Sequence, residues 1–411
     1  MSWASSMHGR WIVDYEERMD PVRMRRDRVQ RLQEQMKKHG LGALLVYHPS
    51  NIQYATGTRH ERYFTVQRFY RYALVPRDRD PILFEFVGVE YQNRMAFAPW
   101  LKDGETLRRS IIWQYSGPAQ EYQAAKWAGD IKETLKQAHV SDLPVGLDRM
   151  DLTMLKALKD QNIEYVDGWP AIWGATNTKT KDELECMKWT AAINDAAFLR
   201  AKEVMKPGVT EYEVAGAIAN VLYSLGCEGI ECIVVASGGH TNPYLREITD
   251  KMIRYGDLVI LDIDPTGPSG YVSDFARTFL VREKGTERQR ELYKECYDQL
   301  QAMLKPIRAG VTTSDIARAM PEELEEAGKM ETTGLLHYGH GIGINLYETP
   351  SISRAFSSKY PMKIEKNMTL AIETYAGKPG EREGVRLEEN IVVTDSGYEL
   401  LNLCPHEDKL L

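Results

Sequence analysis

Three aspartates follow one another in the stretch 258–279, which begins with an apolar run typical of a buried strand. Because successive side chains of a strand point to opposite faces, Asp262 and Asp264 would share one face. A turn rich in Pro and Gly then reverses the chain into a second strand that presents Asp274. Carboxylates on facing strands repel one another unless a cation lies between them, and hard divalent cations are the usual solution. The stretch predicts a metal site or, as the alternative, aspartates in solvent at the end of a hairpin.

Three further residues of metal-binding type occur later in the chain. His340 lies between glycines, which let a ligand approach the backbone closely. Glu373 and Glu388 each interrupt an apolar strand, where a carboxylate is costly unless it is paired or bound to a metal. A histidine in such a place, taken alone, is more often a packing or capping residue. Together with the aspartates, this oxygen-rich set with one imidazole suits two cations such as manganese, iron, cobalt or zinc, which can polarise a substrate and activate water.

Length, charge and cysteine usage limit the possible classes of protein. A chain of 411 residues is too long for one ordinary domain and suggests two. The net charge of -7, with both signs mixed along the chain, argues against nucleic acid as a partner. No apolar run reaches membrane-spanning length and the N-terminus lacks the core of a signal peptide, so we expect no membrane partner. An odd number of cysteines without C-x-x-C spacing fits a cytoplasmic location: Cys186, Cys227, Cys232, Cys296 and Cys404.

The first part of the chain, residues 1–175, is predicted to be a self-contained α/β domain. Amphipathic periodicity predicts helices, and apolar runs predict strands. The expected elements are helices over 21–39 and 122–138 and strands over 41–46, 72–75, 81–86 and 144–148. This first part of the sequence contains no phosphate-binding glycine loop and no nucleophile elbow. The segment 59–71 concentrates cations and aromatics and is interpreted as a surface or subunit contact. Loop composition over 168–181 marks a domain boundary, with the next helix beginning near Lys181.

The second part, residues 176–411, contains an internal sequence repeat. The segment 206–218 recurs as 308–320, and each copy enters through Gly, uses Thr as N-cap and places an acid three residues later. This is the capping box that opens an amphipathic helix, and two boxes with matching flanks suggest duplicated αβ halves. Helices mixed with antiparallel hairpins favour an α+β sheet covered by helices. The expected strands cover 231–236, 258–264, 272–279, 368–374 and 385–393.

The order of these motifs resembles a known family. The segments KPGVTE, SDFARTF, GHGIG and RLEEN resemble the pita-bread metalloenzymes: methionine aminopeptidase, prolidase, aminopeptidase P and creatinase. The likeness covers about 178–402, and the first part looks like the creatinase/prolidase N-terminal domain. It implies an α+β pita-bread fold for 176–411, with Asp274, His340, Glu373, Glu388 and an aspartate of the first strand holding two divalent ions. It also implies a homodimer.

Three departures from that resemblance bear on the reaction. The family usually spaces its two aspartates eleven residues apart, whereas Asp262 and Asp264 lie twelve and ten residues before Asp274. Peptidase members usually carry a histidine after GHGIG, where this chain has Tyr347. They carry another one upstream, at the position of Leu245. Those imidazoles would stabilise the tetrahedral intermediate of peptide hydrolysis by hydrogen bonding. Efficient cleavage of Xaa-Pro bonds is therefore not expected.

The DxD pattern and the segment 241–244 look more like the dimethylsulfoniopropionate lyase branch of the family. That branch implies that both Asp262 and Asp264 join the metal site, and that a base removes a proton next to the substrate carboxylate. Aromatic faces would suit the sulfonium. An aspartate base expected after GHGIG is missing, so a tyrosine or a metal hydroxide could act instead. The candidate catalytic residues are Tyr338, Tyr347 and Glu373, and the candidate substrate-binding residues are His240, Asn242, Tyr244 and Tyr347.

The sequence thus predicts a dinuclear-metal enzyme that acts on a small polar carboxylate, as a lyase giving acrylate and dimethyl sulfide. One alternative is an Xaa-Pro dipeptidase or aminopeptidase, in which Glu373 orients an attacking hydroxide. Another is a module that only binds a partner. The clustered acids argue against that module, because a binding domain gains nothing from burying like charges together.

Overall fold

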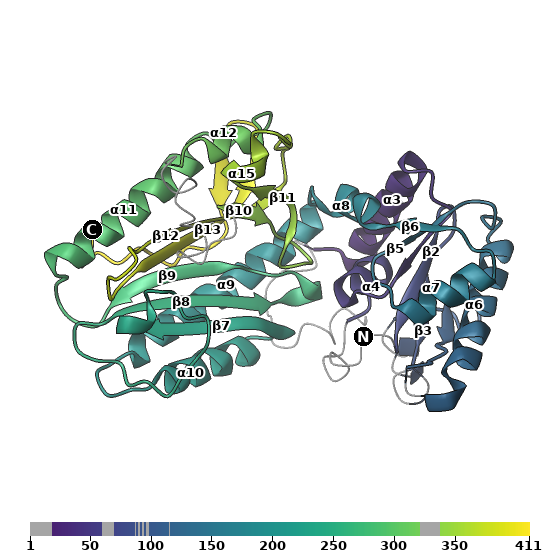
Figure 1. Cartoon of the computed structure of the whole chain (residues 1–411), viewed down its shortest axis with the longest axis horizontal. Helices are drawn as coiled ribbons and strands as arrows, with labels where there is room; N and C mark the ends of the chain where they lie inside the picture. Colours follow the sequence, from purple (N-terminus) through teal and green to yellow (C-terminus); the bar gives the residue numbers. More distant parts are fainter. Residues whose placement is uncertain are drawn as a thin grey trace. The chain divides into compact units, whose positions relative to one another are not determined.

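The computed structural model describes residues 19–320 and 338–411, except 60–69, 87, 89, 90, 93, 96, 97 and 115. The chain divides into two compact units, Met1–Thr176 and Asn177–Leu411. Figure 1 shows the elements of each unit along the chain. Most of the cation-rich and aromatic segment 59–71 lies outside the described residues, so its interpretation as a contact surface stays a prediction.

The first unit is built on a six-stranded mixed sheet with the order β4-β3-β2-β1-β5-β6. Neighbouring strands pair antiparallel at β1–β2 and β2–β3 and parallel at β1–β5, β5–β6 and β3–β4. The short apolar runs predict β1, β2, β3 and β5, because both faces of the central strands are buried, whereas β4 and β6 were not predicted. The strands are β1 (Ala43–Val46), β2 (Tyr72–Pro76), β3 (Ile82–Glu85), β4 (Leu107–Arg109), β5 (Val145–Leu147) and β6 (Tyr165–Asp167).

Helices pack beside this sheet and close its core. Helix α3 begins at the N-cap Asp20, whose side chain accepts two backbone N–H bonds, and it buries one apolar face. Trp113 and Trp127 lie in the core with ring centroids 4.8 Å apart. The helices are α3 (Pro21–Lys38), α4 (Pro49–Thr56), α6 (Gln120–Gln137), α7 (Leu152–Asp160) and α8 (Trp169–Thr176).

Three helices of the second unit begin where the sequence predicts. Capping boxes open α10 at Thr210 and α12 at Thr312, which confirms both predicted boxes. A third box opens α9 at Thr180, so the helix expected near Lys181 is confirmed. The helices are α9 (Lys181–Val204), α10 (Glu211–Ser224), α11 (Glu287–Leu304), α12 (Thr313–Ala317) and α15 (Arg354–Ser357).

Two antiparallel sheets form the rest of this unit. The three-stranded sheet has the order β7-β8-β9, and the five-stranded sheet has the order β11-β10-β12-β13-β14. They lie side by side at β9 and β13 (Figure 1), where Thr278 exchanges two hydrogen bonds with the backbone of Arg386. The strands are β7 (Gly229–Ser237), β8 (Leu258–Thr266), β9 (Phe275–Leu280), β10 (Gly339–Gly341), β11 (Glu348–Ile352), β12 (Thr369–Ala376), β13 (Val385–Val393) and β14 (Tyr398–Leu400).

The largest shift of a predicted strand boundary in this unit is at the start of β9. The strand expected from residue 272 begins at Phe275, so Asp274 precedes it. The side chain of Asn390 bonds both the N–H and the carbonyl oxygen of Asp274, and thereby takes the place of a strand ladder there. The apolar face of α11 packs against β12 and β13 and closes the core of this part of the unit. Among the described residues, the helices are too short or too polar to cross a lipid bilayer.

Candidate metal centre

The aspartates of the three-stranded sheet converge on one buried point. Asp262 and Asp264 lie on the same face of β8, as strand alternation predicts, and Asp274 precedes the adjacent β9. Ligand oxygens of all three lie within 4.8 Å of one another. Each side chain is at least nine-tenths buried. The alternative of solvent-exposed aspartates at a hairpin end is therefore wrong.

The five-stranded sheet supplies the remaining candidates. Glu373 on β12 lies directly opposite Glu388 on β13, and His340 occupies the middle of β10. Ligand atoms of Asp274, His340 and Glu388 lie within 4.8 Å of one another. The Nε2 atom of His340 is 3.2 Å from Asp274 Oδ2 and 4.0 Å from Glu373 Oε1. The structure thus brings the predicted ligands to one centre, in which Asp274 belongs to both groups; their role as ligands stays a proposal.

A buried arginine beside these acids was missed from the sequence. The Nη2 atom of Arg386 lies 2.6 Å from Glu373 Oε2 and 3.3 Å from Glu388 Oε2, and its Nε atom lies 3.3 Å from Asp262 Oδ2. Arg386 and Glu388 are two residues apart on β13 and therefore share a face. That alternation is the signal that could have identified Arg386. One guanidinium cannot neutralise five clustered carboxylates.

Several carboxylate oxygens of the centre have no hydrogen-bond partner among the described residues: Asp262 Oδ1, Asp264 Oδ1 and Glu388 Oε1. Burial, reinforced by neighbouring carboxylates, raises the pKa of Asp264 and of Glu388 well above the ordinary range. Burial also opposes ionisation of Asp274, but the bond and charge of His340 outweigh it and lower the pKa of Asp274. Buried acceptors without donors are costly, and divalent cations satisfy this donor set. The centre therefore fits the two ions predicted from the sequence.

The tyrosines predicted near the substrate have different environments. Tyr244 donates its hydroxyl proton to Asp262 Oδ2 over 2.9 Å. Its ring lies 5.5 Å from the Arg386 guanidinium and 5.7 Å from that of Arg246. With two cations already close to its ring, Tyr244 suits the orientation of Asp262 better than the binding of a substrate cation. Tyr347 remains 57% exposed, and its ring centroid is 4.6 Å from that of His340.

Two predicted site residues are corrected by their surroundings. Tyr338 is 2% exposed and packs in the hydrophobic cluster between α11 and the five-stranded sheet, so it does not face a substrate. Asn242 donates to the carbonyl oxygens of Lys378 and Glu381, and it accepts the hydroxyl of Tyr375. These bonds occupy its amide in holding one loop against another. Neither residue belongs to the proposed substrate site.

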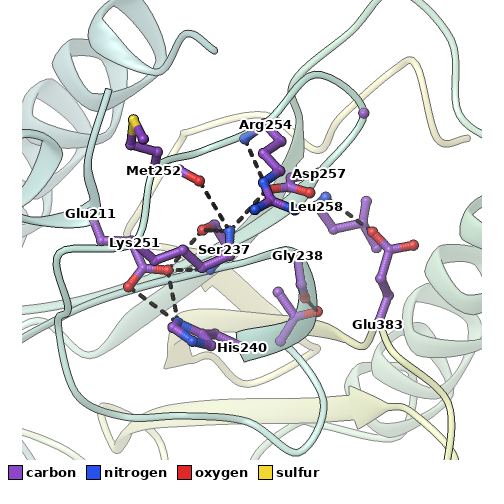
Figure 2. A network of polar contacts seen from close by, with 12 residues as sticks. Glu211, Ser237, Gly238, His240, Lys251, Met252, Arg254, Asp257, Leu258 and Glu383 are labelled. Atoms are coloured by element: carbon purple, nitrogen blue, oxygen red, sulfur yellow. Dashed lines mark hydrogen bonds and ion pairs between the residues drawn. The ribbon is translucent and has the colours of Figure 1, made fainter. Parts of the chain in front are cut away.

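His240 lies in a separate polar network, shown in Figure 2. Its Nδ1 atom is 3.2 Å from Glu211 Oε1, and the buried Glu211 also accepts the N–H groups of Ser237 and Thr249. Lys251 donates to Ser237 Oγ nearby, which adds to the same network (Figure 2). The network holds the loop that contains Tyr244, the residue that bonds Asp262. A contact between His240 and a substrate stays a prediction.

Comparison with known proteins agrees with this geometry. The family described as "Metallopeptidase family M24" matches residues 185–395, and "Creatinase/Prolidase N-terminal domain" matches residues 28–173. Dimethylsulfoniopropionate lyase DddP of Roseobacter denitrificans is 23% identical over 402 residues, which are 95% of this chain and 88% of that protein. Probable dipeptidase PepE of Mycobacterium bovis is 32% identical over 234 residues, but these cover only 56% of this chain and 59% of PepE.

A solved structure shows the same fold. Dipeptidase PepE from Mycobacterium ulcerans superposes with a TM-score of 0.75 at 23% identity, over 95% of this chain and 98% of that one. The predicted pita-bread fold with a creatinase-type N-terminal domain is thus confirmed. Enzymes of the matched family use two divalent ions, such as zinc, manganese, cobalt or iron, which the buried acidic cluster fits. Because the catalytic-domain match spans half of the sequence, this chain belongs to metallopeptidase family M24.

Proposed function

We propose that this enzyme is a lyase that splits a dimethylsulfoniopropionate-like carboxylate by β-elimination. The observation that carries the proposal is the position of Asp264. Its carboxylate lies within 4.8 Å of those of Asp262 and Asp274, and one of its oxygens has no hydrogen-bond partner among the described residues. The centre therefore offers a sixth ligand, as the sequence resemblance to the lyase branch implies.

The extent of the sequence likeness supports the same function. The similarity to the lyase DddP extends over both units of this chain, whereas the similarity to PepE covers little more than half of it. Substrate specificity in such enzymes depends on loops around the metal centre as well as on the metal ligands. DddP therefore informs the loops of both units, but the PepE structure also superposes over 95% of this chain, so the extent of the match supports the lyase only together with the position of Asp264.

The charge of the centre favours a substrate that is itself nearly neutral overall. The five carboxylates of the centre, with Arg386 among them, would be balanced by two divalent cations. A balanced centre has no strong preference for an anion, and so it suits a zwitterion that carries a carboxylate and a sulfonium. When bound, the ions would hold the substrate carboxylate and acidify the adjacent C–H bond.

Tyr347 is the side chain that we assign to proton transfer. Partial burial, together with Asp274 and other carboxylates of the centre, raises the pKa of Tyr347, so its hydroxyl is protonated while those charges are uncompensated. Cations that offset the carboxylates would lower this pKa and let Tyr347 release its proton to solvent. It would then accept the proton from the carbon next to the substrate carboxylate. The C–H electron pair forms the C=C bond of acrylate, the C–S bond breaks, and dimethyl sulfide leaves with the electron pair of the C–S bond.

Gas chromatography of the headspace tests this proposal. Metal-loaded protein incubated with dimethylsulfoniopropionate should release dimethyl sulfide and an equal amount of acrylate. Tyr347→Phe should reduce the release to a small residual rate while the metal content stays unchanged. Absence of dimethyl sulfide from protein with its full complement of metal would contradict the lyase assignment.

The alternative function is hydrolysis of Xaa-Pro peptides, which the 32% identity to PepE favours. In that reaction Glu373 would orient the attacking water. A panel of Xaa-Pro dipeptides with detection of free proline separates the two reactions, because the lyase produces no amine. Proline release without dimethyl sulfide would establish the peptidase.

A further inference from the structure

A buried ion pair lies next to the segment that carries Tyr347. The Nζ atom of Lys179 lies 2.7 Å from Glu348 Oε2, and both side chains are about 1% exposed. Burying two charges costs several kcal/mol per ion, which their attraction repays only when the geometry is good. Such a pair contributes little net stability and is better suited to fixing one conformation.

The same carboxylate also holds the backbone of the segment 343–348. Glu348 Oε1 accepts the N–H groups of Ile344 at 3.0 Å and Asn345 at 3.1 Å. Gly343 packs against the pair so closely that a Cβ atom would lie 2.7 Å from both Glu348 Oε2 and Lys179 Cε. The segment is therefore closed around Glu348, with no room for a side chain at Gly343.

This segment places the Tyr347 ring beside the metal centre. Tyr347 directly precedes Glu348, the first residue of β11, and its ring lies 4.6 Å from that of His340. The Glu348 side chain is buried while the Tyr347 side chain is more than half exposed, so the two point in different directions. Because only one peptide bond separates the two residues, a shift of the Glu348 backbone changes the direction of the Tyr347 side chain.

We propose that Lys179 and Glu348 are positioning residues that set the place of the Tyr347 hydroxyl relative to the bound metals. This inference rests on the proposed function in assigning the proton transfer to Tyr347. Neither positioning residue touches the substrate. For this role, their effect on catalysis must pass through Tyr347 and leave the metal ligands in place. This condition matters because Glu348 lies opposite Gly341, the neighbour of His340, in the sheet register.

The first test measures the position of residue 347 without any substrate. The chain is labelled with 3-fluorotyrosine at position 347, and the ¹⁹F line is recorded before and after Mn²⁺ is added. In the parent protein, paramagnetic Mn²⁺ should broaden the line strongly. Glu348→Ala should weaken this broadening at equal bound Mn²⁺. If this variant fails to fold, the double variant K179M/E348Q replaces it, since it leaves no unpaired buried charge. Equal broadening in the parent and in the variant would overturn the inference.

The second test is a double-mutant cycle on kcat. Glu348→Ala should lower kcat between about 10-fold and 100-fold, the loss expected from a misplaced reacting group. In a Tyr347→Phe background the same change should have almost no effect on residual activity. An undiminished effect in that background would show that Glu348 does not act through Tyr347. Lys366→Met, which breaks an exposed ion pair with Asp395, is the matched control and should change neither measurement.

The two tests separate this inference from the proposed function. If the parent protein releases no dimethyl sulfide, the function fails, yet the ¹⁹F measurement still decides the position of Tyr347. If dimethyl sulfide is released and the cycle shows no coupling, the positioning role fails while the function stands.

Discussion

Buried acids occur in both units of the chain, but their surroundings differ. In the first unit, Glu85 lies 3.0 Å from Arg71 and 2.8 Å from Arg94. Asp148 accepts the N–H groups of Tyr47 and His48 and an amide bond from Asn51. In the second unit, oxygens of Asp262, Asp264 and Glu388 have no such partner among the described residues.

This difference separates structural acids from ligands. A buried carboxylate that serves the fold receives its donors and counter-charges from the protein itself. A buried carboxylate without them must obtain its counter-charge from outside. The pKa values follow the same division: the charges of Arg71 and Arg94 outweigh burial and lower the pKa of Glu85, whereas burial and like charges raise that of Asp264.

The largest effect on metal affinity is expected at Asp274, which belongs to both groups of candidate ligands. Asp274→Ala should reduce affinity for Mn²⁺ or Zn²⁺ by more than about 100-fold, which exceeds the loss typical of residues that only support a ligand. The far-UV circular dichroism should stay native. Equilibrium dialysis with metal analysis measures the change. Retention of the parent metal content would show that Asp274 is not a ligand.

A similarly large effect, but on stability, is expected in the first unit. Glu85→Gln should lower the free energy of unfolding by about 3–5 kcal/mol at pH 7, because two largely buried guanidinium groups lose their counter-charge. Metal affinity should not change. Denaturant titration followed by tryptophan fluorescence measures the loss.

The pH dependence of this loss follows from the lowered pKa of Glu85. A depressed pKa in the folded state stabilises the protein above the ordinary Glu pKa of about 4.3, and this contribution disappears as the pH falls through the folded-state value. The difference between Glu85→Gln and the parent should therefore shrink on acidification below about pH 4. A difference that is constant from pH 7 to pH 3.5 would contradict the ion-pair account.

Asp264→Asn should act in opposite directions with and without metal. In metal-free protein it removes a buried acid whose ionised form is disfavoured by burial and by the neighbouring carboxylates, and it should raise the free energy of unfolding at neutral pH by on the order of 1 kcal/mol. In the presence of metal it removes a ligand and should weaken binding of one ion. Thermal unfolding with and without a chelator tests both. A variant less stable than the parent in the metal-free state would show that Asp264 is paired like Glu85.

The smallest effect is expected from Tyr244→Phe, which deletes the 2.9 Å hydrogen bond to Asp262 and leaves the ring in place. Supporting bonds of this kind contribute about 10-fold to metal affinity. Tyr255→Phe, at an exposed tyrosine bonded to Glu283, is the control. Equal metal affinity in Tyr244→Phe and the parent would restrict Tyr244 to packing.

Much of the candidate centre could be predicted from local sequence rules. Strand alternation placed Asp262 and Asp264 on one face, and the two repeated capping boxes gave the starts of α10 and α12. The costly burial of Glu373 and Glu388 pointed to a partner. These properties depend on a few neighbouring residues, which the sequence displays directly.

The rest depends on contacts between distant parts of the chain. The register that places Glu373 opposite Glu388 and the bonds that occupy Asn242 both require the packed sheets. Tyr338 was a candidate because an aromatic ring suits a sulfonium and a tyrosine could act as base, but packing places it in the hydrophobic cluster. The ion pair between Lys179 and Glu348 joins residues 169 positions apart. The predicted homodimer and cytoplasmic location stay predictions.

The central claim is that the clustered carboxylates of the second unit bind two divalent ions. Anomalous diffraction from crystals of the protein grown with Mn²⁺ tests it most directly. We expect two peaks per chain, both bridged by Asp274 and one of them contacted by Asp264, at oxygen distances of about 2.0–2.6 Å. A chain without peaks among these side chains, or with a single peak that Asp264 does not contact, would contradict this account.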